Sequence, residues 1–229
     1  GPIPRHAEAP PVTQREPEQR GERRLRVRLQ AKLPVLAVSY HIPAANHADE
    51  RPLSILTSVL GSGQTSRLYR ALVYKEQVAT EVGAFADAKL DNGLLTLYAT
   101  LQDGHTASEA ERLIDAQIAR VQNEVVSDRE LQTAKNNILS EFVFRQQRVG
   151  SQAMTIGFFV FYRPLARLNR HLDDVQRVRA EDLQRVARRY LQRQRRTVAE
   201  LVPIPTTDGA ARGHGGRQHS QRGANGVIP

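Results

Sequence analysis

The 229-residue sequence contains no cysteine and no tryptophan, and it has no long apolar run. Without cysteine, the chain can form no disulfide scaffold, thiolate zinc site or cysteine nucleophile. The longest apolar stretch, residues 156–162, is far shorter than the roughly 18 residues that a membrane-spanning helix needs. The first residues, GPIPRHAEAPP, contain no apolar segment, so we expect no signal peptide in them.

Composition divides the chain into three parts. Five of the first 17 residues are proline, which predicts an extended linker or tail over residues 1–22. Residues 205–229 are rich in glycine and arginine without any period, which predicts a disordered tail. Residues 23–204 remain, and their number suits one domain.

Hydrophobic periodicity predicts the elements of this domain. Alternating or β-branched runs predict strands at 24–30, 35–42, 79–86, 94–101 and 197–202. Apolar stripes predict helices at 49–60, 66–77, 150–162, 165–176 and 180–191, with two longer helices between residues 108 and 142. We place the capping boxes of those two at Ser108–Glu111 and Ser127–Glu130. The order predicts an α+β fold, a two-layer, mostly antiparallel (mixed) sheet covered by helices.

The seven histidines do not form a zinc-hydrolase motif. Such a site needs two histidines one helical turn apart and a glutamate, H-x-x-E-H or H-E-x-x-H, and neither string occurs. In the nearest segment, His47 and Glu50 are followed by Arg51, which cannot coordinate zinc. We interpret residues 47–50 as the start of a helix, with Asp49 or Glu50 at its positive end. We therefore assign no metal ligand and no catalytic residue.

Two further patterns have structural interpretations. Residues 61–66, GSGQTS, resemble a phosphate loop, but they follow a helix and lack the lysine of that motif. We read them as a helix-to-helix turn. His41 lies within a strand pattern, and no G-x-S-x-G elbow accompanies it, which favours a packed or hydrogen-bonded residue over a catalytic base.

The net charge of +9 is concentrated in one segment. Residues 163–196 carry 11 basic and 4 acidic side chains, a balance of +7, whereas residues 31–162 carry 12 and 14, a balance of −2. An arginine run can bind nucleic acid through its phosphates. Because no aromatic platform accompanies the arginines, we interpret them as a solvated helix face and expect no nucleic-acid partner.

Two separated motifs resemble a known peptidase family. Residues 40–85 contain Y-H-x-P, an apolar helix that ends in a glycine turn, and S-R-L-Y-x-x-L-V-x-x-x-x-V-A. Residues 171–203 resemble a closing helix of the form V-T-x-x-D-V-x-x-x-A-x-x-Y, followed by a strand. Together they resemble the C-terminal domain of the inverzincin zinc peptidases, the family of pitrilysin, insulysin and the mitochondrial processing peptidase.

This resemblance implies a metalloprocessing-peptidase-like domain that holds no zinc. In that family, an N-terminal domain carries H-x-x-E-H and a distal glutamate, which bind zinc and activate water. The C-terminal domain closes a chamber around the peptide. The resemblance therefore implies no cofactor in this chain and zinc in an N-terminal domain outside this sequence. It implies as partners that zinc-bearing domain or a partner subunit, and a peptide substrate. Many bacterial relatives are exported, so it is compatible with a periplasmic location, which the chain itself does not define.

The resemblance also marks two positions for substrate binding. Some C-terminal domains of the family supply an arginine and a tyrosine, seven residues apart, that hold the substrate. The spacing of the motif puts these positions at Val73 and Thr80. Valine has no donor and threonine is too short to replace a phenol, so we assign no substrate-binding residue. In two-subunit bacterial members the zinc-bearing chain lacks this pair, so the resemblance implies the C-terminal half of a zinc-bearing subunit of a heterodimer.

The leading functional hypothesis is therefore a non-catalytic chamber domain of a zinc metalloendopeptidase, inactive by itself. It would shape the peptide cleft, contact the peptide through its sheet edge and pair with a zinc-bearing domain or subunit. The alternative is a non-enzymatic scaffold or assembly subunit of the same fold, as in the core proteins of respiratory complexes. A basic nucleic-acid-binding protein is a third hypothesis, which depends on the arginines alone.

Overall fold

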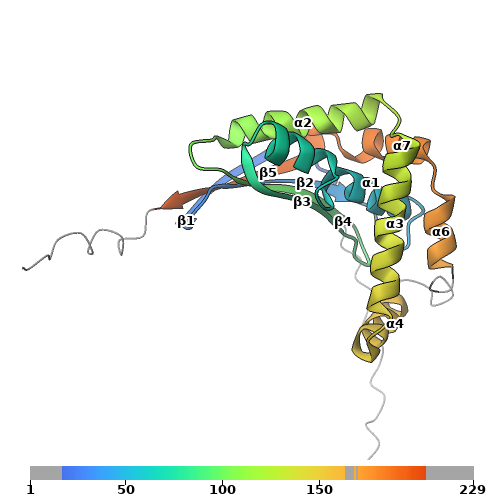
Figure 1. The fold of residues 1–229 in the computed structure, drawn as a ribbon. Coiled ribbons are helices and arrows are strands. Elements are labelled where there is room, and N and C mark those ends of the chain that lie inside the picture. The colour runs from blue at the N-terminus through green and yellow to red at the C-terminus, as the bar shows by residue number, and fades with distance from the viewer. Residues whose placement is uncertain (1–16, 163–167, 169, 205–229) are drawn as a thin grey trace, which may run out of the picture.

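Five strands form one sheet in the computed structural model, which describes residues 17–162, 168 and 170–204 (Figure 1). They are β1 (Arg23–Gln30), β2 (Val35–Ile42), β3 (Ala79–Asp87), β4 (Gly93–Leu101) and β5 (Arg196–Ile204). Their order across the sheet is β1-β5-β2-β4-β3. β1 and β5 run parallel, and the other neighbours are antiparallel. The predicted α+β fold with a mostly antiparallel, mixed sheet is confirmed.

Some predicted segments lie outside the described residues. They include residues 1–16 of the expected N-terminal linker and all of the expected tail at 205–229. The helix expected at 165–176 is described only in part, and its described part, α6, begins at His171.

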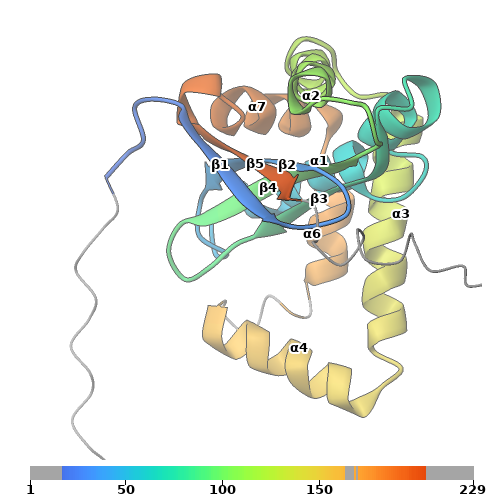
Figure 2. The same ribbon diagram turned by 90° about the vertical axis from the view of Figure 1, so that its left-hand side faces the viewer.

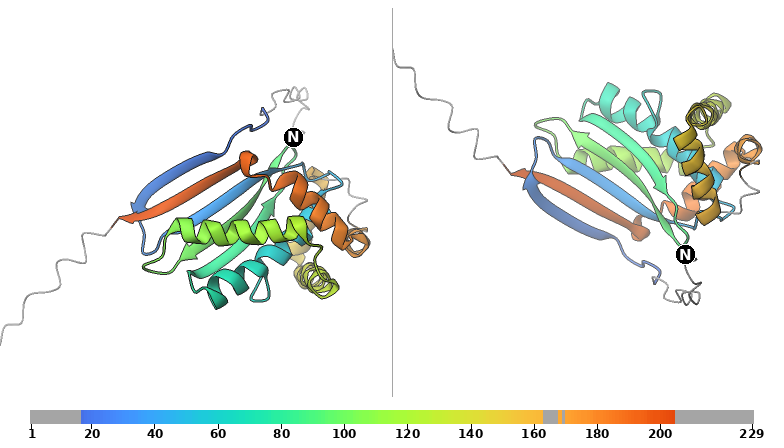
Figure 3. Two further views of the ribbon diagram at one scale, coloured as in Figure 1. Left: turned by 90° about the horizontal axis from the view of Figure 1, so that it is seen from above. Right: turned by 90° about the horizontal axis from the view of Figure 1, so that it is seen from below.

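The helices of the described residues gather mainly on one side of the sheet. They are α1 (Glu50–Gly61), the π-helix η1 (Tyr69–Lys75), α2 (Ala107–Asn123), α3 (Asp128–Arg145), α4 (Val149–Tyr162), α6 (His171–Arg177), α7 (Ala180–Tyr190) and the short 3₁₀ helix η2 (Arg193–Arg195). α1, α2 and α7 cover one face of the sheet (Figures 1 and 3). α4 turns away from the lower end of α3 (Figure 2). In the described part of the chain, no helix lies across the opposite face of the strands.

The core forms between the covered face of the sheet and these helices. Alternate residues of β2 and β4 point toward the helices, as period-2 geometry requires. The buried apolar side chains that β2 and β4 contribute are Leu36, Val38, Tyr40, Ile42, Leu95, Leu97, Ala99 and Leu101. Each large side chain among them stabilises the fold by about 1.5–3 kcal/mol through burial. Gly61 allows the end of α1 to approach β3, because a Cβ there would lie 2.4 Å from the backbone nitrogen of Ala84.

One of the two predicted capping boxes is wrong. α2 begins at a box between Thr106 and Glu109, in which each side chain accepts from the other residue's backbone N–H, and not at Ser108–Glu111. Both pairs have the same spacing and residue types, so the pattern alone did not separate them. Glu111 is buried instead and pairs with Arg24 and Arg196. The box predicted at Ser127–Glu130 is confirmed.

Arg196, the first residue of β5, is a buried charge with only 1% of its side chain exposed. Its guanidinium donates to Glu22 (2.7 Å), to Asp115 (2.5 Å) and to Glu111. Burial opposes the charge, but these hydrogen bonds outweigh it and raise the pKa of Arg196. The interpretation of the arginine run as a solvated helix face is wrong for this residue, because three carboxylates on the covered side of the sheet neutralise it.

Replacement of Arg196 tests how far the fold depends on this cluster. We expect Arg196→Gln to lower the free energy of unfolding by about 3–5 kcal/mol, because it leaves partly buried carboxylates without their cation. Urea denaturation followed by circular dichroism measures the change. Arg177→Gln, at a side chain that is 74% exposed, is the matched control and should cost less than about 0.5 kcal/mol. Equal midpoints for the two variants would contradict a central role for Arg196.

Candidate functional site

The helix-free face of the sheet, here called the open face, carries mostly uncharged side chains. The strand registers place on it Arg23, Leu25, Val27, Leu29, Val35, Ala37, Ser39, His41, Glu81, Gly83, Phe85, Asp87, Leu94, Thr96, Tyr98, Thr100, Thr197, Ala199, Leu201 and Pro203. The carboxylates among them, Glu81 and Asp87, both lie on the edge strand β3. A surface made mostly of apolar and hydroxyl groups suits contact with a peptide.

Side chains in the middle of the open face hold one another in place. Ser39 and Thr96 share a hydrogen bond of 2.9 Å between their hydroxyl oxygens. The Tyr98 ring packs 6.4 Å from that of Phe85 and lies over Gly83, where a Cβ would be 2.4 Å from the ring. The Tyr98 hydroxyl donates to Glu81 at 3.2 Å. Burial, and then the nearby Glu81 carboxylate, raises the pKa of Tyr98, so this phenol stays neutral at physiological pH.

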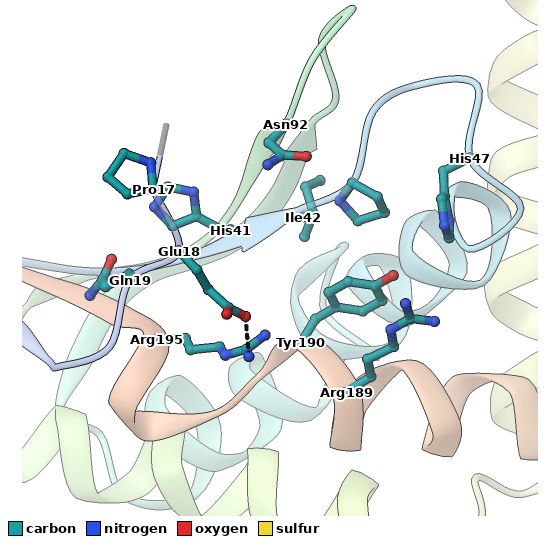
Figure 4. A pocket seen from close by; sticks show the side chains of 11 residues that line it. Pro17, Glu18, Gln19, His41, Ile42, His47, Asn92, Arg189, Tyr190 and Arg195 are labelled. Carbon is teal, nitrogen blue, oxygen red and sulfur yellow. Dashed lines mark ion pairs between the residues drawn. The ribbon is translucent and has the colours of Figure 1, made fainter. Parts of the chain in front are cut away.

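A cavity of about 350 Å³, here called the β2-end pocket, opens where β2 leaves the sheet (Figure 4). Its lining comes from five parts of the chain: the N-terminal segment, the end of β2, the loop before α1, the β3–β4 turn, and the α7–η2 region. The lining residues are Pro17, Glu18, Gln19, His41, Ile42, Pro43, His47, Asn92, Arg189, Tyr190 and Arg195. Inside it, the Glu18 carboxylate pairs with Arg195. His41 lies on the open face and also lines this pocket.

Asp49 lies behind the β2-end pocket and joins α1 to α7. Its buried carboxylate accepts from Arg185 (2.6 Å), from the Tyr190 hydroxyl (2.7 Å) and from Arg189 (3.3 Å). Burial alone would raise the pKa of Asp49, but the bonds from Tyr190 and Arg185 keep it below its ordinary value. Two arginines of the predicted solvated face, both about half exposed, thus pair with a buried carboxylate.

The segment nearest to a zinc motif has a structural role. The Nδ1 atom of His47 accepts from the backbone N–H of Asp49 at 3.0 Å, and Asp49 directly precedes α1. This agrees with the interpretation of residues 47–50 as a helix start. The Asp49 oxygens are already bonded to side chains of α7. Across the described ranges, no three histidine or carboxylate side chains converge on a possible metal position. The residues present do not fit a catalytic zinc ion.

The positions that the family resemblance assigns to substrate binding lie on irregular backbone. Val73 lies in the π-helix η1, half-buried against the core, and Thr80 lies near the start of β3, where the register shifts between Ala79 and Glu81. The Thr80 hydroxyl donates to the carbonyl of Thr100 at 3.3 Å. π-Helices and strand irregularities are frequent at functional sites. The backbone irregularity is present here, whereas the side chains carry neither a guanidinium nor a phenol.

The other sequence motif, GSGQTS, forms the expected turn between α1 and η1. Gly63 has a φ of +73°, a conformation that favours glycine. The Ser66 hydroxyl donates to the Gly63 carbonyl at 2.7 Å, and Arg67 next to it is buried. Arg67 makes a two-pronged ion pair with Glu130, at 2.8 and 3.0 Å, which ties the start of η1 to the start of α3.

Sequence reasoning did not find the β2-end pocket or the Asp49 cluster. The i, i+4 spacing of Arg185 and Arg189 places these two side chains on one helix face and could have indicated a common partner. Nothing in the sequence marks Asp49 as that partner, because it lies more than 130 residues away along the chain.

Comparison with known sequences gives a family. Residues 1–138 match the family described as the peptidase M16 inactive domain. The chain is also 24% identical, over 190 residues, to the zinc protease PqqE of Helicobacter pylori. That alignment covers 82% of this chain and 43% of the relative, so the chain spans less than half of the length of this curated protein.

Comparison with solved structures gives the same fold. A protease from Helicobacter pylori superposes with a TM-score of 0.81 at 24% identity, covering 86% of this chain and 48% of that one. The inactive peptidase domain of a candidate zinc protease from Bordetella parapertussis superposes with a TM-score of 0.71 at 26% identity. Here the match covers 81% of this chain and 98% of the other, so the chain is similar to nearly all of that isolated domain.

The Arg67–Glu130 pair makes stability depend on pH. Pairing with Arg67, against the opposing effect of burial, lowers the pKa of Glu130 from 4.5 to about 2. The ionised carboxylate therefore stabilises the fold above pH 4.5, and this contribution is lost as the pH falls from 4.5 to about 2. We expect Glu130→Gln to cost about 2 kcal/mol at pH 7, since the pair is partly exposed, and progressively less below pH 4.5.

Urea denaturation at several pH values checks this expectation. Glu124→Gln removes an exposed carboxylate of the same kind and should cost less than about 0.5 kcal/mol at every pH. If the difference in unfolding free energy between the wild type and Glu130→Gln stays constant between pH 7 and pH 2.5, the ion pair is not its cause.

Proposed function

This chain belongs to the peptidase M16 inactive-domain family, and from that membership we propose that it is the non-catalytic C-terminal domain of a zinc metalloendopeptidase. The family expected from the motifs at 40–85 and 171–203 is thereby confirmed. In this proposal a separate zinc-bearing domain or subunit carries out the hydrolysis. We propose that the chain divides into a linker at 1–22, the domain at 23–204 and a tail at 205–229, with Gln19 and Glu22 of the linker bonded to Arg196 of the domain.

The open face carries this proposal, because it is a broad sheet surface that the described chain leaves without a helix. We propose that it forms one wall of the peptide cleft. Its apolar side chains would contact the peptide's side chains, and its hydroxyl groups would bond the main chain. The edge strands β1 and β3 offer backbone groups for strand pairing, which needs no particular peptide sequence.

The partner would supply the groups that this chain lacks. Val73 and Thr80 provide no guanidinium or phenol for the substrate, so we propose that the heterodimer partner provides them. In this proposal the chain holds no zinc, and the zinc lies in the N-terminal domain. These assignments rest on the family resemblance and on the positions of the two residues in η1 and β3.

We propose that the zinc-bearing partner covers α4. This helix contains no charged residue over Val149–Tyr162, and Val149, Met154 and Phe161 are each more than 70% exposed. An apolar surface of this kind marks an interaction site. Among the described helices, none is both long enough and apolar enough to cross a membrane. The Helicobacter pylori relatives are more than twice as long as the aligned part, which leaves room for a second domain.

The isolated chain tests the non-catalytic assignment. We expect no stoichiometric zinc by metal analysis and no cleavage of a quenched fluorescent peptide, because the described residues place no three ligands together. Zinc-dependent cleavage should appear on addition of the domain that carries H-x-x-E-H together with the partner subunit that supplies the guanidinium and the phenol. His105→Ala, at a histidine outside the β2-end pocket, is the control and should change neither result. Zinc-dependent cleavage by the isolated chain would overturn the assignment, and a partner with a degenerate motif would favour the scaffold alternative.

Substitutions on α4 test the pairing. We expect Phe161→Glu to weaken binding of the zinc-bearing partner at least tenfold, because a charge would be buried in an apolar contact. Isothermal titration calorimetry measures the affinity. Tyr74→Glu places the same charge on another exposed aromatic, outside α4, and should leave the affinity unchanged. Equal affinities for the two variants would exclude α4 from the interface.

A further inference from the structure

The β2-end pocket contains more guanidinium and imidazole groups than the carboxylate of Glu18, the acidic residue of its lining, can pair with. Two guanidinium groups, Arg189 and Arg195, and two imidazoles, His41 and His47, line it. Arg189 bonds Asp49 through one nitrogen, Nη1, and a guanidinium has five N–H donors. Because Nδ1 of His47 accepts a backbone N–H, the neutral ring carries its proton on Nε2. The pocket therefore favours an anion with several hydrogen-bond acceptors.

A carboxylate already lies in this pocket. Glu18, on the segment that leads to β1, points into it and pairs with Arg195 (Figure 4). Its side chain is 62% exposed, and exposed ion pairs contribute at most about 1 kcal/mol. A ligand carboxylate can therefore take its place at little cost.

The backbone beside Glu18 is held separately. The buried side-chain amide of Gln19 donates to the carbonyl of Arg196 at 2.7 Å and to that of Gly21 at 2.8 Å. The Glu18 side chain can thus leave Arg195 while its neighbour keeps the segment in place. The Glu18 carboxylate therefore occupies the position beside Arg195 that a ligand carboxylate could take.

We propose that the β2-end pocket binds the terminal carboxylate of a peptide whose preceding residues lie on the open face. His41 connects the two, since it is the last residue of β2 on that face and also lines the pocket. Arg195 and Arg189 bind the carboxylate, and Ile42 and Pro43 contact the terminal side chain. Glu18 competes with the peptide for Arg195. This subsite rests on the proposed function, since it needs the open face to hold the peptide.

Fluorescence anisotropy with labelled ten-residue peptides tests the subsite. We expect the free acid to bind at least tenfold more tightly than the C-terminal amide. Arg195→Gln should reduce the affinity for the free-acid peptide to that for the amide. Glu18→Gln should raise the affinity for the free-acid peptide severalfold. Arg120→Gln removes an exposed arginine on α2 and is the charge-matched control, expected to change nothing. Circular dichroism confirms that each variant is folded.

Two further probes distinguish a failure of the carboxylate site from a failure of the open face. N-acetyl-leucine and its amide, followed by NMR, report on the pocket without the open face, and only the acid should shift the signals of the pocket residues. Loss of peptide binding with retention of this shift would count against the open face and not against the carboxylate site. Equal binding of acid and amide would overturn the subsite. An amide peptide that ends in glutamate and binds as tightly as the free acid would overturn the assignment to the terminal carboxylate.

Discussion

The buried charge of Arg196 is the interaction on which the arrangement of this chain depends. Its guanidinium draws together the N-terminal segment through Glu22 and helix α2 through Glu111 and Asp115. It also lies against Tyr40 of β2, whose pKa burial raises to about 12. A charge in this position destabilises the fold unless every partner is present. The first and last parts of the domain are therefore held at one point.

This constraint extends to the proposed peptide site. The side chain of Gln19 donates to the carbonyl of Arg196, and Glu18 is the residue directly before Gln19. Arg196 therefore also fixes the segment from which Glu18 enters the β2-end pocket. The arginines of α7 act in the same way, since Arg185 and Arg189 hold α7 to α1 through Asp49. Three arginines of the +7 segment, Arg185, Arg189 and Arg196, thus pair with buried carboxylates.

The two faces of the sheet have separate roles. The covered face packs against α1, α2 and α7 and supplies most of the core, so substitutions there change stability. The open face and α4 expose apolar and hydroxyl groups to solvent. Exposed apolar surface of this kind is typical of an interaction site. The chain's membership in the peptidase M16 inactive-domain family agrees with this division.

The sequence by itself determined the strands, most of the helices, the family and the absence of a zinc motif, because these depend on local period and on residue types at short spacing. It did not determine which of two equivalent capping boxes begins α2, because Thr106–Glu109 and Ser108–Glu111 satisfy the same pattern. Only the tertiary structure decided that Arg196 is buried, that Asp49 meets α7 and that Glu18 enters a pocket. Each of these depends on pairing between residues more than 80 positions apart, and local patterns carry no information about such contacts.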